Sequence, residues 1–256
     1  MARLTCDVFS ESLEVGTSVT VLLPQPTEEQ IGVSGADVTG PPPVLYLLHG
    51  LSDDHTAWTR YTSIERYAAE RGLAVVMPAV GRSFYADEAH GHRYWTWVSQ
   101  ELPELVARFF RVATEPASTF VAGLSMGGYG ALRLALTHPE RYAAAASLSG
   151  ALDVVELAAG PRTALFDRIH GGAPGPEADL FALLERAEHV PPLHVSCGTE
   201  DPLLPGSEKL IAAARARGVD VTADLRPGEH EWGLWDTVIR EVVDWLPIPG
   251  APVSAG

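Results

Sequence analysis

The sequence predicts an α/β fold in which a mostly parallel central sheet has helices on both faces. Continuous apolar runs of strand length alternate with longer segments of helical periodicity, which is typical of strands buried on both sides. A Gly-x-Ser-x-Gly turn at residues 123–127 joins one such strand to one such helix. The chain has 256 residues, 46% of them hydrophobic, so we expect a single domain over residues 1–256 with a large core.

The first 43 residues predict an antiparallel pair of strands followed by an irregular segment. Residues 3–10 and 13–23 alternate or run apolar around Ser12 and Gly16, a pattern typical of strands at a sheet edge. Residues 24–43 are rich in Pro, Gly, Thr and Glu, so we expect a surface excursion there.

The middle of the chain predicts the parallel strands and the helices that connect them. Buried strands are expected at residues 44–48, 73–77, 118–122 and 142–148. Helices are expected at residues 63–71, 95–111 and 126–137. Because ligands bind at the carboxyl ends of parallel strands, the loops that follow these strands are where we expect the site.

The last third of the chain breaks this alternation once and then resumes it. Residues 151–192 lack the regular spacing, and we expect either a small cap-like insertion over the site or a plain surface insertion. Residues 247–256 are rich in Pro, Gly and Ala and are expected to form a frayed tail. The remaining predicted elements are strands at 193–197 and 219–225 and helices at 204–217 and 232–245.

The charge and the segment composition exclude several classes of function. With 18 basic against 33 acidic residues the net charge is -15, which repels nucleic acid, so no nucleic-acid partner is expected. No apolar run approaches the roughly 18 residues of a membrane span, and residues 1–7 lack the apolar core of a signal peptide. We therefore expect a cytoplasmic protein that makes no membrane contact. Two cysteines, Cys6 and Cys197, are too few for a disulfide framework.

The turn at residues 123–127 has the form of a nucleophile elbow. In such an element a serine lies at the tip of a strained strand-to-helix turn, and glycines two places before and after it leave room for the backbone. Gly123, Ser125 and Gly127 occupy those places. The following helix offers unpaired N–H groups, so we expect the Met126 N–H to be one donor of an oxyanion hole. The alternative is a glycine-rich turn without chemical consequence.

A serine nucleophile needs a histidine base and a carboxylate, and α/β-hydrolases carry the three in the order serine, acid, histidine. His230 is the only histidine after Asp201, and it lies in a loop between the last strand and the last helix. Asp201 follows the strand at 193–197, where the acid is expected, and its neighbour Glu200 is the competing candidate. We expect Ser125, Asp201 and His230 to act together.

Two further loops supply the rest of the expected site. A His-Gly pair at 49–50 follows the strand at 44–48, and similar loops give α/β-hydrolases a second oxyanion donor, here the Leu51 N–H. Among the aromatic residues near these loops, Trp58 and Tyr85 are expected to wall a small substrate pocket.

Other residues of reactive or aromatic type are expected to have structural roles. His49 is expected to orient its loop rather than to transfer a proton. His90 and His92 flank a glycine without a third ligand at a recognisable spacing, so no metal is expected. Trp235 lies at helical spacing from Ile239 and is expected in the core.

Several segments form a specific combination of motifs: Leu48-His49-Gly50-Leu51, Gly81-Arg82-Ser83-Phe84-Tyr85, Glu101-Leu102-Pro103, Gly123-Leu124-Ser125-Met126-Gly127-Gly128-Tyr129-Gly130-Ala131-Leu132, Ser149-Gly150 and Gly228-Glu229-His230-Glu231-Trp232. Together they resemble the tributyrin-esterase branch of the esterase D family. That family also includes S-formylglutathione hydrolases and the antigen 85 mycolyltransferases. The resemblance covers about residues 44 to 246.

The resemblance implies an α/β-hydrolase fold and a carboxylesterase that hydrolyses short-chain acyl esters through an acyl-enzyme intermediate. Ser125 is then the nucleophile, His230 the base and Asp201 its orienting acid, while Leu51 and Met126 supply the oxyanion N–H groups. The implied partner is a small-molecule acyl ester, and no cofactor is implied. Members of the family often self-associate, so a homo-oligomer is compatible with the resemblance.

Three alternatives stay open at this point. A thioesterase similar to S-formylglutathione hydrolase would use the same tetrahedral intermediate, and an acyltransferase would pass the acyl group to an alcohol or sugar instead of water. A non-catalytic ligand-binding protein that keeps the α/β-hydrolase fold belongs to a different class of function.

Overall fold

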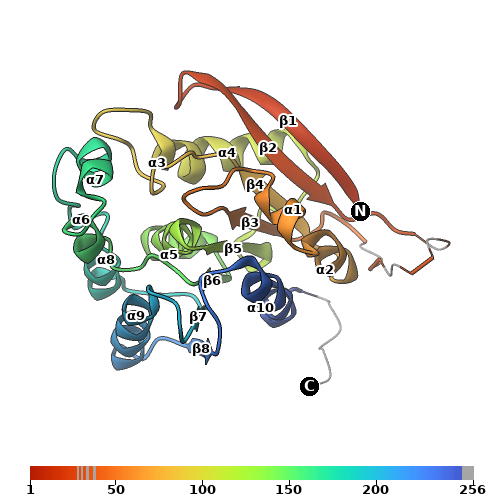
Figure 1. Ribbon diagram of the computed structural model, residues 1–256. Coiled ribbons are helices and arrows are strands. Elements are labelled where there is room, and N and C mark those ends of the chain that lie inside the picture. The colour runs from red at the N-terminus through yellow and green to blue at the C-terminus, as the bar shows by residue number, and fades with distance from the viewer. Residues whose placement is uncertain (28, 30, 33–34, 37–38, 250–256) are drawn as a thin grey trace.

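One sheet organises the molecule. The structure is a computed structural model that describes residues 1–27, 29, 31–32, 35–36 and 39–249. Within these residues eight strands form one sheet in the spatial order β1-β2-β4-β3-β5-β6-β7-β8 (Figure 1). The strands are β1 (Ala2–Ser10), β2 (Val15–Leu23), β3 (Val44–Leu48), β4 (Ala74–Pro78), β5 (Thr119–Leu124), β6 (Ala144–Leu148), β7 (Leu193–Gly198) and β8 (Val221–Arg226).

The sheet is antiparallel at one edge and parallel elsewhere. β1 pairs with β2 and β2 with β4 in antiparallel register, whereas all pairs from β4 to β8 are parallel. Parallel strands deliver their carboxyl ends to a common edge, so the loops that follow β3, β5, β7 and β8 meet there. The described architecture is the α/β-hydrolase fold that the sequence predicts.

Helices make the connections between the parallel strands. No helix among the described residues combines the length and the apolar character that crossing a bilayer requires. The helices are α1 (Ala57–Tyr61), α2 (Ile64–Glu70), α3 (Tyr94–Thr96), α4 (Leu102–Phe109), α5 (Met126–Thr137), α6 (Val154–Ala158), α7 (Thr163–His170), α8 (Leu180–Arg186), α9 (Leu204–Ala216) and α10 (Trp232–Trp245).

The helix predicted at residues 95–111 is divided. A π-helical turn, Trp97–Glu101, separates α3 from α4. Because Pro103 has no N–H, it cannot donate to the carbonyl of Ser99 four residues earlier, and that carbonyl accepts from the Arg141 guanidinium at 2.5 Å instead. Periodicity alone places the apolar residues of this segment correctly but carries no sign of the change in helical winding.

The Glu101 carboxylate ties the β1–β2 hairpin to this helical segment. It accepts hydrogen bonds from the Ser10 hydroxyl at 2.7 Å and from the N–H groups of Glu11 and Ser12 at 2.8 and 2.9 Å. A carboxylate that accepts several N–H and O–H donors makes strong, charge-assisted hydrogen bonds. The Glu-Leu-Pro motif therefore serves the packing of the β1–β2 hairpin at the edge of the sheet.

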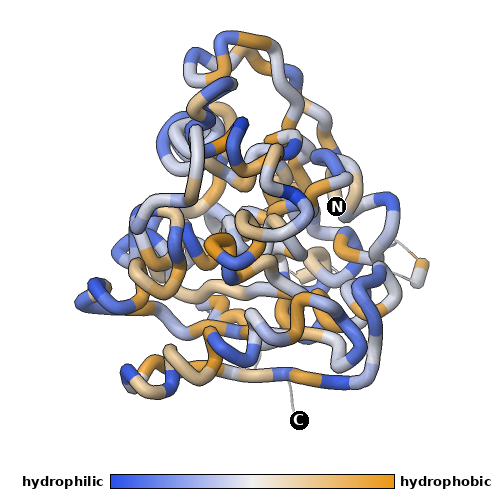
Figure 2. The backbone as a smooth tube through the Cα atoms, turned by 60° about the vertical axis from the view of Figure 1, so that its left-hand side comes forward, coloured by the Kyte–Doolittle hydropathy of each residue, from blue (hydrophilic) through white to orange (hydrophobic). Residues whose placement is uncertain are grey.

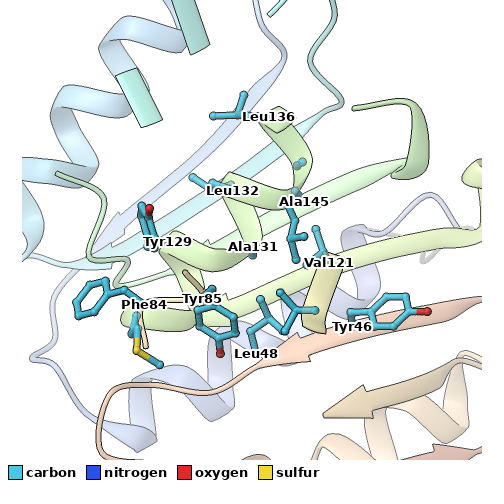
Figure 3. Packing of buried hydrophobic residues seen from close by; sticks show 14 of the residues in the cluster. Tyr46, Leu48, Phe84, Tyr85, Val121, Tyr129, Ala131, Leu132, Leu136 and Ala145 are labelled. Atoms are coloured by element: carbon cyan, nitrogen blue, oxygen red, sulfur yellow. The ribbon is translucent and has the colours of Figure 1, made fainter. Parts of the chain in front are cut away.

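The sheet separates two apolar cores. Helices α4, α5, α8 and α9 bury their apolar faces on one side, and α1, α2 and α10 on the other. Along β3 the side chains alternate, with Tyr46 and Leu48 packing towards α5 (Figure 3) and Leu45 and Leu47 towards α10. Hydrophilic and hydrophobic stretches alternate along the outer helices (Figure 2), as expected for helices with one face in water.

Residues 151–192 hold three helices, α6, α7 and α8, beyond the end of β6 (Figure 1). α8 packs against α5 and α9, so the segment is fixed to the main body at one end. Its function as a cap, and the single-domain organisation of residues 1–256, stay predictions. Part of the predicted excursion at 24–43, and residues 250–256 of the predicted frayed tail, lie outside the described residues.

Close backbone contacts explain the glycines of the turn between β5 and α5. A Cβ atom on Gly127 would lie 2.3 Å from the Leu48 carbonyl oxygen, and one on Gly123 would lie 2.4 Å from the carbonyl of Gly127. Both obstacles are backbone atoms, which cannot move aside as a flexible side chain can. Only glycine allows α5 to start this close to the end of β3.

Replacing Gly127 with alanine is expected to destabilise the fold by about 3 kcal/mol, because the new methyl group overlaps the β3 backbone. Gly206→Ala is the matched control, since its Cβ would meet its nearest atom at an ordinary 3.6 Å in the first turn of α9. Urea unfolding of both variants measures the difference. Equal midpoints for the two variants would contradict the steric explanation.

Candidate active site

Ser125 lies at the tip of the turn between β5 and α5 in a strained conformation. Its φ of 53 and ψ of -117 fall outside the regions that L-residues prefer. The strain is held by the neighbouring chain: the Ser125 N–H donates to the Leu148 carbonyl at 2.9 Å, and the Ser125 carbonyl accepts from the Ala151 N–H at 3.0 Å. Such an outlier at a strand-to-helix turn is a mark of a functional serine.

Three polar side chains meet at the carboxyl ends of the strands. His230 Nε2 lies 3.1 Å from Ser125 Oγ, and His230 Nδ1 lies 2.7 Å from Asp201 Oδ2. The serine follows β5, the aspartate follows β7 and the histidine follows β8, so the sheet brings together residues that are far apart in sequence. With the proton on Nδ1, the ring can accept the serine proton while the carboxylate stabilises the imidazolium.

The Asp201 carboxylate is buried and well supplied with hydrogen-bond donors. Burial raises its pKa, but the hydrogen bond from His230 and one from the Leu203 N–H at 2.8 Å outweigh that effect, so the pKa is lower than usual. The group therefore stays ionised at neutral pH and holds one orientation of the histidine ring.

Glu200, the competing candidate for the acid, has a different position. Its carboxylate accepts the Gly228 N–H at 2.6 Å, and its own N–H donates to the Gly228 carbonyl at 3.1 Å. These two bonds fasten the loop that carries His230 to the loop after β7. The geometry thus places Asp201, and not Glu200, against the imidazole.

Aromatic residues support the His230 ring from the side of α10. Trp235 meets the imidazole edge-on with ring centroids 4.8 Å apart, and Trp232 packs against Trp235 at 5.2 Å. Trp235 is buried, as the sequence predicts, and it also borders the site. The ring is thus held between an indole and the Asp201 carboxylate.

The loop after β3 is organised by His49. Its Nδ1 lies 2.7 Å from the Gly50 carbonyl, its Nε2 accepts the Val80 N–H at 3.1 Å, and burial lowers its pKa to about 4. The neutral ring therefore serves as a bridge between this loop and the loop after β4. Leu51, expected to offer an oxyanion N–H, borders the same cavity as Ser125 and Met126.

A cavity of about 660 Å³ opens at Ser125. Its floor is the turn after β5, and its walls come from the loops after β3, β4, β6, β7 and β8 and from the segment 151–192. The residues that line it are Gly50, Leu51, Ser52, Asp53, Arg82, Phe84, Leu124, Ser125, Met126, Ala151, Leu157, Arg162, Phe166, Pro202, Leu203, His230, Trp232 and Trp235.

The prediction that Trp58 and Tyr85 wall the pocket is corrected by their positions. Both are buried beneath the site and neither lines the cavity. The Trp58 indole N–H donates to the Leu48 carbonyl at 3.1 Å, and the Tyr85 hydroxyl donates to the His49 carbonyl at 2.8 Å. Each aromatic residue therefore braces the end of β3 through its polar atom.

Phe84, Phe166 and Trp232 line the cavity instead; the sequence places Trp232 near the loops of the site but does not predict a pocket role for Phe84 or Phe166. Phe84 and Tyr85 both have positive φ, at 49 and 51. In such a turn the strand rule of alternating faces fails, so the pattern could not show which aromatic residue faces the site. The available signal was the motif Gly-Arg-Ser-Phe-Tyr itself, which contains both rings.

The histidine pair at 90 and 92 lies outside the lining of this cavity. Among the residues that the structure describes, no group of three or more His, Cys, Asp or Glu side chains could hold a metal ion.

A family model described as "Putative esterase" matches residues 10–245. The chain belongs to this esterase family. It is also 26% identical to an acetyl esterase of Caldicellulosiruptor saccharolyticus, over 96% of this chain and 98% of the relative.

Two solved structures extend the comparison. A substrate-bound, fluorophosphonate-binding serine hydrolase of Staphylococcus aureus is 33% identical with a TM-score of 0.86, over 96% of this chain and 98% of that one. An S-formylglutathione hydrolase of the same organism is 32% identical with a TM-score of 0.82, at the same coverage. Family, fold and site agree that this esterase is a serine hydrolase of the carboxylesterase class with a small-molecule ester as substrate.

The buried His49 predicts a loss of stability in acid. Unfolded, this histidine takes up a proton below about pH 6.5, whereas the folded ring stays neutral down to about pH 4. The unfolded state therefore binds more protons in this window, and stability falls as the pH drops through it, by about 3 kcal/mol at pH 4.

The measurement is urea unfolding from pH 7 to pH 4 for the parent and for His49→Gln, which lacks the titrating group. The variant is expected to show the flatter pH dependence, whatever its stability at pH 7. Burial also lowers the pKa of His194, but this histidine contributes to the pH dependence of stability in both proteins and therefore does not affect the comparison. Parallel curves would exclude His49 as the source.

Proposed function

We propose that this esterase hydrolyses short-chain acyl esters in two steps, with Ser125 as nucleophile, His230 as general base and Asp201 as the acid that orients it. The observation that carries the proposal is the continuous contact from Ser125 Oγ through the His230 ring to the Asp201 carboxylate, at 3.1 and 2.7 Å. A serine hydroxyl is a weak nucleophile at neutral pH and needs such a base within hydrogen-bond reach.

In the first step Ser125 Oγ attacks the ester carbonyl while His230 Nε2 takes its proton. The carbonyl oxygen becomes an oxyanion, which the N–H groups of Leu51 and Met126 would stabilise by hydrogen bonding. The imidazolium then gives its proton to the leaving alcohol oxygen as the carbon–oxygen bond breaks. The acyl group stays on Ser125 as an ester.

In the second step water replaces the alcohol. His230 removes a proton from the water, the hydroxide attacks the acyl carbonyl, and the same N–H groups hold the second oxyanion. Collapse of this intermediate returns the proton to Ser125 and releases the carboxylic acid. The ionised Asp201 stabilises the imidazolium in both steps, and its low pKa suits that role.

The size of the cavity suits a small-molecule ester. About 660 Å³ accommodates a short acyl chain together with a modest alcohol, and it lies within the range of small-molecule sites. The similarity to an acetyl esterase over nearly the full length of both chains points in the same direction. The cytoplasmic location expected from the sequence stays a prediction, and so does the homo-oligomer with which the family resemblance is compatible.

Thioester hydrolysis is the second candidate, because an S-formylglutathione hydrolase is similar over nearly the whole chain. An ester and a thioester pass through the same tetrahedral intermediate, so one site can serve both. The ratio of kcat/KM for S-formylglutathione to that for 4-nitrophenyl butyrate separates the two. Transfer to an added alcohol would instead appear as a new ester product.

Ser125→Ala is expected to lower kcat for 4-nitrophenyl acetate by at least about 1000-fold, because the covalent intermediate can no longer form. A fluorophosphonate probe should label the parent and leave the variant unlabelled. The melting temperature serves as the control for folding. A variant that keeps the parent's rate would refute the assignment of the nucleophile.

Asp201→Asn and Glu200→Gln form a matched pair for the acid. Loss of the carboxylate at 201 removes the partner of His230 and is expected to lower kcat by about 10⁴-fold. The amide of Glu200→Gln can still accept the Gly228 N–H, so that variant should stay within about tenfold of the parent. Steady-state rates on 4-nitrophenyl acetate measure the two effects. A larger loss for Glu200→Gln than for Asp201→Asn would assign the role of the acid to Glu200.

A further inference from the structure

Two arginines border the cavity that contains Ser125. Arg82 comes from the loop after β4, and Arg162 from the connection between α6 and α7. Neither guanidinium forms a hydrogen bond or ion pair with any residue that the structure describes. By contrast, Arg168 and Arg226 are both paired with carboxylates.

The two walls that carry these arginines are fastened together. Arg168 of α7 pairs with the buried Glu88 carboxylate at 2.7 Å and donates to the Arg82 carbonyl at 3.2 Å. The Ala89 N–H donates to the Ile169 carbonyl at 2.7 Å. The loop after β4 and the helix that follows Arg162 thus form one continuous surface of the cavity.

Apolar side chains accompany the arginines on this surface. Phe84 and Phe166 pack with ring centroids 4.8 Å apart, and both line the cavity together with Leu157. A wall of this composition fits a ligand that has a hydrocarbon segment and an anionic end. Guanidinium groups bind carboxylates through paired N–H donors, which gives direction as well as strength.

The remaining charges do not cancel this attraction. Asp53 is the acidic residue that lines the cavity, and it lies in the loop after β3, where burial raises its pKa. The net charge of -15 opposes an approaching anion, but surface charges are screened beyond about 8 Å at physiological ionic strength. Within the cavity, direct contact with the two guanidinium groups therefore determines whether an anionic ligand binds.

We propose that the preferred substrate carries a carboxylate, which Arg82 and Arg162 bind while the ester carbonyl lies at Ser125. This rests on the proposed ester hydrolysis and narrows it to a class: half-esters of dicarboxylic acids, or esters of carboxylated alcohols. The Arg82 of the Gly-Arg-Ser-Phe-Tyr motif thereby acquires a role in specificity that the reaction steps do not assign.

The test compares charged and neutral substrates of matched size. The acyl arm uses 4-nitrophenyl hemiadipate against 4-nitrophenyl heptanoate, and the alcohol arm uses 4-acetoxybenzoate against its methyl ester. Each pair is measured with the parent, Arg82→Gln, Arg162→Gln, the double variant and the control Arg111→Gln, an exposed arginine outside the cavity.

In one arm the double variant is expected to lose about tenfold in kcat/KM for the anionic substrate, mainly through a higher KM. The loss is modest because both arginines are exposed, and charged hydrogen bonds at exposed sites lie at the weak end of the usual range. The neutral partner and Arg111→Gln should stay within about twofold. The arm that responds shows whether the carboxylate belongs to the acyl or the alcohol part.

Equal losses on charged and neutral substrates, or no loss in either arm, would overturn the carboxylate preference while leaving ester hydrolysis intact. Failure of the proposed function gives a different result, because the parent would then hydrolyse neither neutral ester. The unchanged neutral rates also show that the variants are folded.

Discussion

The close approach of α5 to the end of β3 is the constraint on which the site depends. Because Gly127 lies directly against the Leu48 carbonyl, the first turn of the helix and the loop after β3 meet at one point. Ser125 is forced into its strained conformation there, and both segments expected to offer oxyanion N–H groups border the same cavity. Steric contact between backbone atoms thus determines where the chemistry can occur.

The position of His230 depends on several contacts, each of which is weaker than the steric contact at Gly127. Asp201 holds one edge of the His230 ring, Trp235 packs beside it, and Glu200 secures the loop through Gly228. The two neighbouring carboxylates therefore have different roles. Asp201 interacts with the imidazole, and Glu200 interacts with the backbone of the loop that carries it. This division explains why two adjacent acidic residues follow β7.

Much of the fold and the principal side chains could be predicted from the sequence, because buried parallel strands are continuous apolar runs and the order serine, acid, histidine is a strong restriction. The choice between Asp201 and Glu200 needed coordinates, since both follow the same strand. The direction of Phe84 and Tyr85 was not predictable where positive φ interrupts the alternation of faces. Nothing in the sequence indicates that Arg162 borders the cavity, because the position of this residue depends on how the irregular segment 151–192 packs.

The contacts between α7 and the loop after β4 have a consequence for engineering the segment 151–192. Arg168 belongs to the segment 151–192, whereas Glu88 and the Arg82 carbonyl belong to the loop. A replacement segment that lacks an arginine at position 168 would leave the Glu88 carboxylate buried without this counterion. The segment 151–192 and the loop after β4 therefore have to be exchanged together in this chain unless the new segment keeps that arginine.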